Sequence, residues 1–208
     1  MNRAEKRRKK KLSDKAVKNE KLVQASSFMP AEAKQTLTIE QAIDLAVQHH
    51  SAGDLVKAEG IYNQILQVDP NQPIALHLLG VIAHQVGKND ISIDLITKAL
   101  AIKPDYAEAH NNLGNVHKDQ GSFEEAAVCY NKAISIKPDF PEAFTNLGIV
   151  LQELGQLDES VKSYNKAITV KPDYAEAHFN LGIALKNQGQ LEEAINSYNR
   201  AIALEANY

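Results

Sequence analysis

Three asparagines stand 34 residues apart, at Asn112, Asn146 and Asn180. An asparagine side chain carries a carbonyl oxygen that accepts and an amino group that donates, so it can pair with both the N–H and the C=O of a peptide unit. A row of such side chains would hold an extended peptide by its backbone without reading its side chains. The competing interpretation is that asparagine is simply tolerated at a half-exposed position. We favour ligand contact.

The histidines are the next candidates for chemistry, because imidazoles at helical spacing can bind zinc. His77 and His84 are seven residues apart, and His50 lies 34 residues before His84. No acidic ligand is interleaved with them at metal-site spacing, and the HExxH pattern is absent. We therefore expect hydrogen-bonded or solvated histidines and no metal, with a pH-sensitive binding groove as the alternative.

Catalytic motifs are missing from the sequence. It contains no GxSxG, no phosphate-binding glycine loop and no dinucleotide-binding fingerprint. The single cysteine, Cys129, has Glu124 and Glu125 nearby, and these carboxylates would raise the pKa of its thiol and make it a poor nucleophile. We expect a protein that is not an enzyme and needs no cofactor.

The asparagines recur because most of the chain recurs. Five copies of a 34-residue unit occupy 39–72, 73–106, 107–140, 141–174 and 175–208. Counted from the start of a copy, position 7 is always leucine, position 15 is always glycine, and position 24 is tyrosine in four copies. Self-similarity at this period indicates a solenoid of stacked units, since one unit cannot bury its own apolar face.

Each unit has the pattern of a helix, a tight turn, a second helix and a stop. Glycine at position 15 suits the left-handed residue that ends a helix, and proline at position 32 stops the second helix. Capping boxes are predicted at Thr38, Asp105 and Ser122, each followed three residues later by Glu or Gln. Glycine at position 8 of four copies lies inside a helix, where it costs roughly 0.5–1 kcal/mol against alanine. It therefore predicts a close approach of the two helices.

These residues resemble the tetratricopeptide repeat (TPR) family over 39–208. The resemblance rests on Leu113, Gly114, Gly121, Ala126, Tyr130, Ala133 and Pro138 and on their equivalents in the other copies. Two departures are the lack of the family's tryptophan at position 4 and the presence of Ile96 where an aromatic residue is expected. The resemblance implies an all-α, right-handed superhelical TPR solenoid of five helix-turn-helix repeats, in a TPR domain that covers 38–208.

The resemblance also implies where a partner binds. In this family the first helix of each repeat lines a concave groove, mainly through positions 2, 5, 6, 9, 12 and 13. The expected function is a non-catalytic protein-protein interaction module or scaffold that holds an extended peptide or a partner helix in that groove. The asparagine ladder would anchor the backbone and neighbouring residues would tune selectivity; the full set is Asn112, Asn146, Asn180, Asn111, Asn115, Lys118, Phe179 and Lys186.

Two other uses of a TPR groove bear on this sequence. The repeats are similar to the TPR arm of O-linked N-acetylglucosamine transferases and of bacterial TPR proteins that carry transferase domains. This similarity implies a substrate-recruiting arm as the alternative function, although no residue of a catalytic transferase domain is present. A carboxylate clamp for chaperone tails is disfavoured, because Glu108, Glu142 and Glu176 occupy position 2, where a clamp lysine would be expected.

Charge divides the chain into two parts. Residues 1–38 carry 11 Lys or Arg and 4 Asp or Glu, whereas the repeats are acidic enough to bring the net charge to −3. We expect 1–37 to be a basic, flexible N-terminal tail that is solvated or folds back on the acidic repeats. The alternatives are a grip on nucleic acid or anionic lipid, or a nuclear address. Nucleic acid is disfavoured because no aromatic residue interleaves the basic run.

Composition and the last repeat complete the expectations. One cysteine excludes a disulfide within the chain, and no apolar run is long enough for a membrane span or a signal peptide. We therefore expect a cytoplasmic location. No capping helix follows the fifth repeat, so apolar surface should remain uncovered at Leu191, Ala194, Tyr198, Ala201 and Ile202. This surface predicts either self-association or an origin as the arm of a longer polypeptide.

Overall fold

The computed structural model describes residues 22–24 and 36–205 of the 208-residue chain. Most of the expected N-terminal tail, 1–37, lies outside the described residues. Two short strands before the first helix are described: β1 (Leu22–Gln24) pairs antiparallel with β2 (Thr36–Thr38), with Leu22 opposite Thr38 and Gln24 opposite Thr36.

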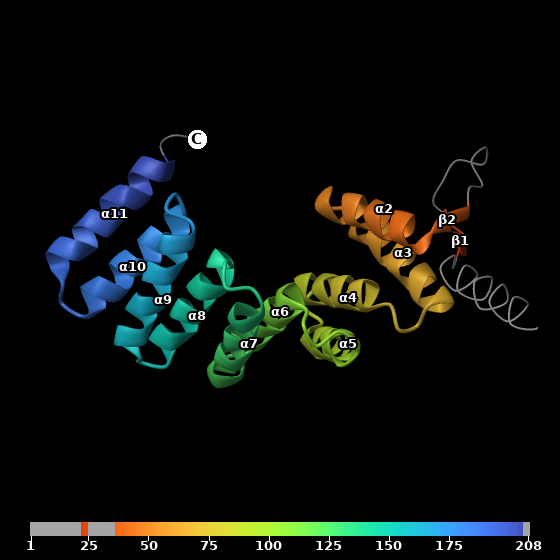
Figure 1. Ribbon diagram of the computed structural model, residues 1–208, viewed down its shortest axis with the longest axis horizontal. Coiled ribbons are helices and arrows are strands. Elements are labelled where there is room, and N and C mark those ends of the chain that lie inside the picture. The colour runs from red at the N-terminus through yellow and green to blue at the C-terminus, as the bar shows by residue number, and fades with distance from the viewer. Residues whose placement is uncertain (1–21, 25–35, 206–208) are drawn as a thin grey trace, which may run out of the picture.

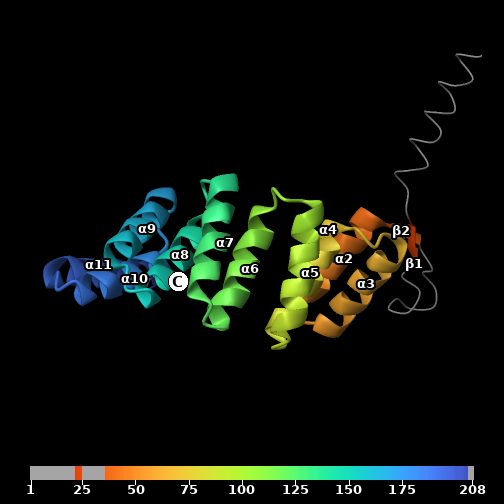
Figure 2. The same ribbon diagram turned by 90° about the horizontal axis from the view of Figure 1, so that it is seen from below.

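Helical hairpins make up the rest of the described chain and follow one another along its long axis in sequence order (Figures 1 and 2). The strand pair contacts the first hairpin, at the opposite end from the last one (Figure 1). The prediction of an all-α repeat fold is confirmed. The helices are α2 (Ile39–Ser51), α3 (Leu55–Val68), α4 (Pro73–Gln85), α5 (Asn89–Ile102), α6 (Ala107–Asp119), α7 (Phe123–Ile136), α8 (Pro141–Glu153), α9 (Leu157–Val170), α10 (Ala175–Asn187) and α11 (Leu191–Glu205).

The glycine at position 15 makes the turn inside every hairpin. These five glycines have φ between +73° and +80°, a left-handed conformation that a Cβ atom resists. In the third hairpin, for example, α6 ends at Asp119, Gln120 caps it, and Gly121 then reverses the chain. The prediction that these glycines terminate the first helices is confirmed.

The glycine at position 8 lies where the two helices of a hairpin approach most closely. A Cβ atom added to Gly114 would stand 2.6 Å from the ring of Tyr130, and one added to Gly148 would stand 2.5 Å from the ring of Tyr164. Both distances are far below van der Waals contact, so a Cβ atom at Gly114 or Gly148 would clash with the tyrosine at position 24 of its own hairpin. Repeat one has Ala46 and Tyr62 at these two positions, so the restriction is not common to all five hairpins. The predicted close approach is confirmed, and it explains why a helix-weakening residue recurs there.

Helix starts were predicted less well than helix ends. The capping box at Thr38 is present, with its hydroxyl accepting from Gln41 N and the Gln41 side chain accepting from Thr38 N. The box at Asp105 is wrong, because the cap residue of α6 is Tyr106 and makes no side-chain cap. Ser122 does stand at the start of α7, but its hydroxyl makes no cap hydrogen bond either. The backbone conformation does not explain the missing caps, because Asp54 precedes α3 with a similar ψ of 68° and its side chain still accepts from Lys57 N.

The apolar core runs through the solenoid as a series of clusters. Each hairpin also packs on the next one: Phe123 and Ile134 of α7, for instance, share a cluster with Leu147 and Val150 of α8. First helices of successive hairpins are therefore held side by side from α4 to α10. No helix in the described part of the chain has the length and apolarity needed to cross a membrane.

Candidate functional site: the row of first helices

Hydrogen bonds join neighbouring first helices at a fixed spacing of 35 residues. His77 pairs with Asn112 and Asn111 pairs with Asn146, which in both cases links position 5 of one repeat to position 6 of the next. We call this set of contacts the inter-repeat seam. It uses the same helix face on which the asparagine ladder was predicted, so the structure places Asn112 and Asn146 within the seam.

His77 is the centre of the first part of the seam. Its side chain is 2% exposed, and burial lowers its pKa to about 4, so the imidazole is neutral near pH 7. The amino group of Asn112 donates to Nε2 at 2.8 Å, which leaves Nδ1 as the protonated nitrogen. Nδ1–H then donates to the hydroxyl of Tyr106 at 3.0 Å. Asn112 is thus tied to a fully paired, buried histidine.

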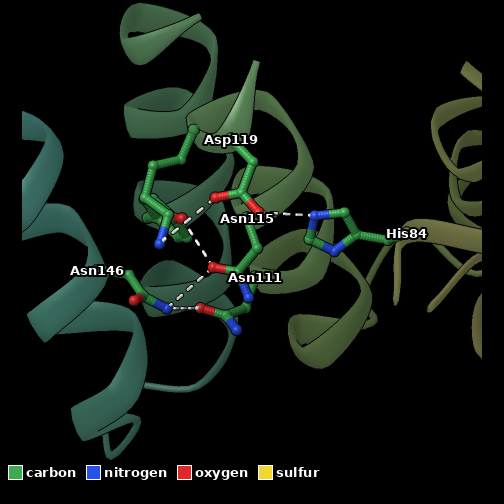
Figure 3. A network of polar contacts seen from close by, with 7 residues as sticks. His84, Asn111, Asn115, Asp119 and Asn146 are labelled. Atoms are coloured by element: carbon green, nitrogen blue, oxygen red, sulfur yellow. Dashed lines mark hydrogen bonds and ion pairs between the residues drawn. The ribbon is translucent and has the colours of Figure 1, made fainter. Parts of the chain in front are cut away.

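Asn146 occupies the second part of the seam (Figure 3). Its amino group donates to Oδ1 of Asn111 and to Oδ1 of Asn115, both at 3.2 Å. Oδ1 of Asn115 also accepts from the Tyr130 hydroxyl at 2.8 Å. The three asparagines therefore form one network that spans α6 and α8, and the tyrosine at position 24 supports it from α7.

Asn180 differs from its two equivalents, because its half-buried side chain makes no hydrogen bond to any described residue. Position 5 of the preceding repeat is Thr145, which is 1% exposed and whose hydroxyl also has no partner among the described residues. Hydrogen bonds thus join position 5 to position 6 between repeats two and three and between repeats three and four, and we call these junctions closed. The junction between repeats four and five lacks such a bond among the described residues, and we call it open.

The remaining predicted site residues lie at different points along the row. Lys118 is half-buried with its Nζ 3.9 Å from Asp119, and Lys186 is exposed. Phe179 is more than half exposed, with its ring centroid 5.8 Å from that of Tyr198. The structure brings Asn111, Asn115 and Asn146 together but does not bring Lys186 or Phe179 into that network.

Sequence reasoning did not find which residues hold the asparagines. His77 was considered as a metal ligand or a pH-sensitive group, and not as the partner of Asn112. Tyr106 and Tyr130, which contact His77 and Asn115, were not among the candidate site residues. A search for polar residues 35 apart, rather than 34, would have found the His77 and Asn111 pairs. That offset arises because position 6 of one first helix lies beside position 5 of the preceding one.

A second line of polar contacts crosses the same helices at positions 12 and 13. His50 Nε2 contacts Gln85 Oε1 at 2.9 Å, and His84 Nε2 contacts Asp119 Oδ2 at 2.9 Å (Figure 3). Both pairs again join residues 35 apart. Within residues 22–24 and 36–205, no three His, Cys, Asp or Glu side chains gather as a metal site would require.

Cys129 lies on α7, the second helix of the third repeat, and is half-buried. Burial, and to a smaller extent the charge of Glu125, raises the pKa of its thiol to about 11. The thiolate is the reactive form of cysteine, so this thiol is inert near neutral pH. The expectation of a poor nucleophile agrees with this environment, although burial rather than the neighbouring charge is the larger cause.

The outer face of α11 carries exposed apolar side chains. Leu191, Ile195 and Ile202 are each more than half exposed. Ala194 and Ala201 are buried, so the expectation that they remain uncovered is wrong. The two alanines occupy positions 20 and 27, which are buried in every repeat, because they pack against the first helix of their own hairpin.

Comparison with known families identifies the repeats. The family described as "TPR repeat" matches residues 97–121, 114–155 and 153–189, and the family described as "Tetratricopeptide repeat" matches residues 175–208. These matches together run from residue 97 to residue 208, more than half of the chain. None of the curated proteins matches this chain.

Solved structures show the same arrangement of helices. The crystal structure of MamA is 26% identical, with a TM-score of 0.70 over 79% of this chain and 98% of MamA. MamA from Desulfovibrio magneticus RS-1 is 17% identical, with a TM-score of 0.71 over 81% of this chain and 96% of that one. Pseudomonas aeruginosa pilF is 20% identical, with a TM-score of 0.75 over 79% of this chain and 75% of pilF. The last two likenesses concern the fold alone.

Proposed function

This chain belongs to the tetratricopeptide repeat family, and from that premise we propose that its row of first helices binds an extended peptide or a partner helix. Repeats of this family are in general non-catalytic modules that bind other proteins. The proposed site is the face that carries Asn112, Asn146 and Asn180. The protein would act there as a scaffold, and its ligand would be a segment of another protein.

The observation that carries this proposal is the way in which two of the asparagines are held. The amino groups of Asn112 and Asn146 donate to the preceding repeat, whereas neither side-chain carbonyl oxygen has a partner among the described residues. Each oxygen is therefore fixed in direction and free to accept from a ligand N–H. An acceptor that is already oriented loses little further freedom on binding, which favours affinity.

Selectivity would come from the side chains that flank the ladder. Lys118 and Lys186 both occupy position 12 of their repeats, so they would favour acidic residues in the ligand. Phe179, more than half exposed, would contact an apolar ligand residue beside Asn180. We infer a ligand that combines a backbone-bound segment with acidic and apolar side chains.

A matched set of alanine variants tests the ladder. A ligand is first selected from a random peptide display library, and its affinity is measured for the Asn112, Asn146, Asn180 triple alanine variant. The control is the triple alanine variant of Asn131, Asn165 and Asn199, which are also 34 residues apart but exposed on second helices. Three lost hydrogen bonds at about 0.5 kcal/mol or more each should weaken binding at least about ten-fold, and the control should not.

A single substitution distinguishes a loss of binding from a loss of folding, which could also weaken binding in the triple variant. Asn180 has no hydrogen-bond partner within the described chain, so Asn180→Ala should leave thermal stability unchanged and still reduce affinity. If both triple variants bind the selected peptide as the unmodified protein does, the asparagines are not the binding site.

The alternative function, a substrate-recruiting arm of a protein glycosyltransferase or related transferase, would use the same groove. It rests on the similarity to such arms that we expect from the sequence of repeats three to five. Its distinguishing requirement is a transferase that modifies the bound segment. Selected peptides that carry no acceptor serine or threonine, yet bind with full affinity, would argue against this role. A cytoplasmic location also stays part of the proposal, and cell fractionation checks it.

Self-association through α11 is a further proposal about partners. Leu191, Ile195, Tyr198 and Ile202 are spaced by four, three and four residues, the spacing of a coiled-coil seam, and three of them are largely exposed. We propose that two copies pair through this stripe. The mass in solution should rise with concentration, and Ile202→Lys should abolish the rise. Val128→Lys, at an equally exposed valine on α7, is the control.

A further inference from the structure

A small apolar cavity lies between the first and second hairpins. Its volume is about 110 Å³, and its apolar walls come from α4, from the turn that follows it and from α5. Two exposed charged side chains, Glu59 of α3 and Lys88 of the turn, also line it. The apolar walls are Leu79, Ile82, Ala83, Val86, Ile91 and Leu95.

The cavity exists because two repeat positions depart from the rest of the chain. Glu59 stands at position 21, where the next three repeats have Ile93, Ala127 and Val161. Ala83 stands at position 11, where the fourth and fifth repeats have leucine. At those later junctions the two positions belong to one packed cluster, as Val161 and Leu185 do. A charged residue and a small one therefore leave unfilled the space that apolar side chains fill elsewhere.

The surface around the cavity is apolar and carries unpaired charge. Val86 and Ile91, which line the cavity, are each more than half exposed. Neither Glu59 nor Lys88 forms an ion pair with another residue in the described part of the chain. An apolar hollow flanked by an acid and a base fits a segment in which one apolar side chain lies between a base and an acid.

We propose that this cavity holds Leu12 of the chain's own N-terminal segment. In the run KKKLSD, Leu12 lies directly after Lys11 and two residues before Asp14, so a base and an acid flank it. Lys11 would pair with Glu59, and Asp14 would pair with Lys88. Apolar cavities of about 150 Å³ take up benzene, which has six carbon atoms. A leucine side chain has four carbon atoms, so it suits the smaller volume of about 110 Å³ found here.

The reach of the chain allows this contact. The segment joins β1 at Leu22, and β1 contacts α3, the helix that supplies Glu59. Leu12 is ten residues before Leu22, and an extended chain covers about 3.3 Å per residue, so Leu12 can lie up to roughly 33 Å from β1. Docking would also bring the basic run Arg7–Lys11 next to acidic repeats.

This surface is distinct from the proposed ligand site. The cavity uses positions 7, 10 and 11 of α4, whereas the seam and the asparagine ladder use positions 5, 6, 12 and 13 of the first helices. The segment could therefore occupy the cavity while the row of first helices binds a ligand. The apolar side chains at Val86 and Ile91 would lose their exposure to water.

The test uses the full-length chain with a nitroxide spin label beside the anchoring residue. Ser13→Cys is labelled in a Cys129→Ser background, and the δ1 methyl signals of isoleucines are recorded with the nitroxide oxidised and reduced. The signals of Ile82 and Ile91 should be broadened at least two-fold more than that of Ile183, which lies on α10. Mixtures of spin-labelled and isotope-labelled chains separate contact within one chain from contact between chains.

Two matched substitutions identify the anchor. Leu12→Asp should abolish the selective broadening, and Val17→Asp, at the next large apolar residue of the segment, should preserve it. High salt should reduce the broadening, because the flanking charge pairs are exposed. The proposal is overturned if broadening is absent, uniform over the isoleucines, present only between chains, or unchanged in Leu12→Asp.

Discussion

The first helices lie side by side both in the seam between repeats two and four and at the junction between repeats four and five, but the polar contacts at these places differ. In the seam, His77 and Asn111 receive the amino groups of Asn112 and Asn146. At the later junction, Thr145 and Asn180 occupy the same two positions and make no hydrogen bond to any described residue. Helix packing in this solenoid therefore does not depend on the seam, which leaves these positions open to a functional role.

The difference originates in the length of one side chain. Histidine and asparagine at position 5 place an acceptor far enough from their own helix to meet position 6 of the next repeat. The Thr145 hydroxyl is attached directly to Cβ and makes no such contact. Asn112 and Asn146 are therefore held in place before a ligand arrives, whereas Asn180 would have to be ordered by the ligand itself, at a cost in side-chain entropy.

The largest expected effect concerns the pH dependence of stability in the closed part of the seam. The pKa of His77 is about 4 in the folded chain and 6.5 in the unfolded chain. Between these values the unfolded state binds a proton that the folded state does not, so the stabilisation is complete above pH 6.5 and is lost as the pH falls towards 4. Urea unfolding measures the free energy of unfolding at each pH, and His77 should account for a loss of about 2–3 kcal/mol between pH 7 and pH 4.5.

His77→Gln supplies the reference for that measurement, because glutamine does not titrate but keeps hydrogen-bonding groups at this position. The variant should lose less stability than the unmodified protein between pH 7 and pH 4.5. Equal losses in the two proteins would mean that His77 is not held neutral by burial.

A smaller effect is expected when equivalent asparagines are replaced, one within the seam and one at the junction between repeats four and five. Asn112→Ala removes the donor to Nε2 of His77 and leaves a buried acceptor unpaired, which should lower the free energy of unfolding by about 1–3 kcal/mol at pH 7. Asn180→Ala removes no internal hydrogen bond and should change it by less than about 0.5 kcal/mol. Chemical denaturation of both variants measures the contrast, and similar losses would show that Asn180 also has an internal partner.

The smallest effect is expected at Thr145. Thr145→Val replaces a buried hydroxyl that has no partner with a methyl group of similar size, so stability should stay the same or rise by up to about 1 kcal/mol. Asn111→Leu, at the same position of the preceding repeat, should be destabilising because Asn146 loses an acceptor. Thermal denaturation distinguishes the two, and a clear loss in Thr145→Val would mean that the hydroxyl is bonded.

Several features of the hairpins could be predicted from the sequence because they depend on backbone conformation that recurs in each repeat. Gly121 and its equivalents were identified as left-handed turn residues because glycine stands at that position in all five copies, and Gly114 was identified as a point of close approach because glycine recurs there in four. The start of α6 was predicted incorrectly. The helix begins one residue later than the capping pattern indicates, since Tyr106 and not Asp105 precedes its first residue.

The candidate site was predicted only in outline. Its helix face followed from the resemblance and from the period of the asparagines, but the partners of Asn112 and Asn146 did not. Those partners lie in the preceding repeat, and which side chains meet there depends on how far one hairpin is displaced relative to the next. The exposed stripe on α11 was anticipated at Leu191 and Ile202 but not at Ile195.

The sequence by itself determined the repeat, the helical hairpins and the glycines that shape them, because steric limits on φ and on helix contact act within 34 residues. Only the tertiary structure decided that two asparagines are locked to the preceding repeat, that a third is not, and that a cavity remains beside Ala83. These features depend on side chains from different hairpins meeting at particular distances. Residue type alone does not determine such distances.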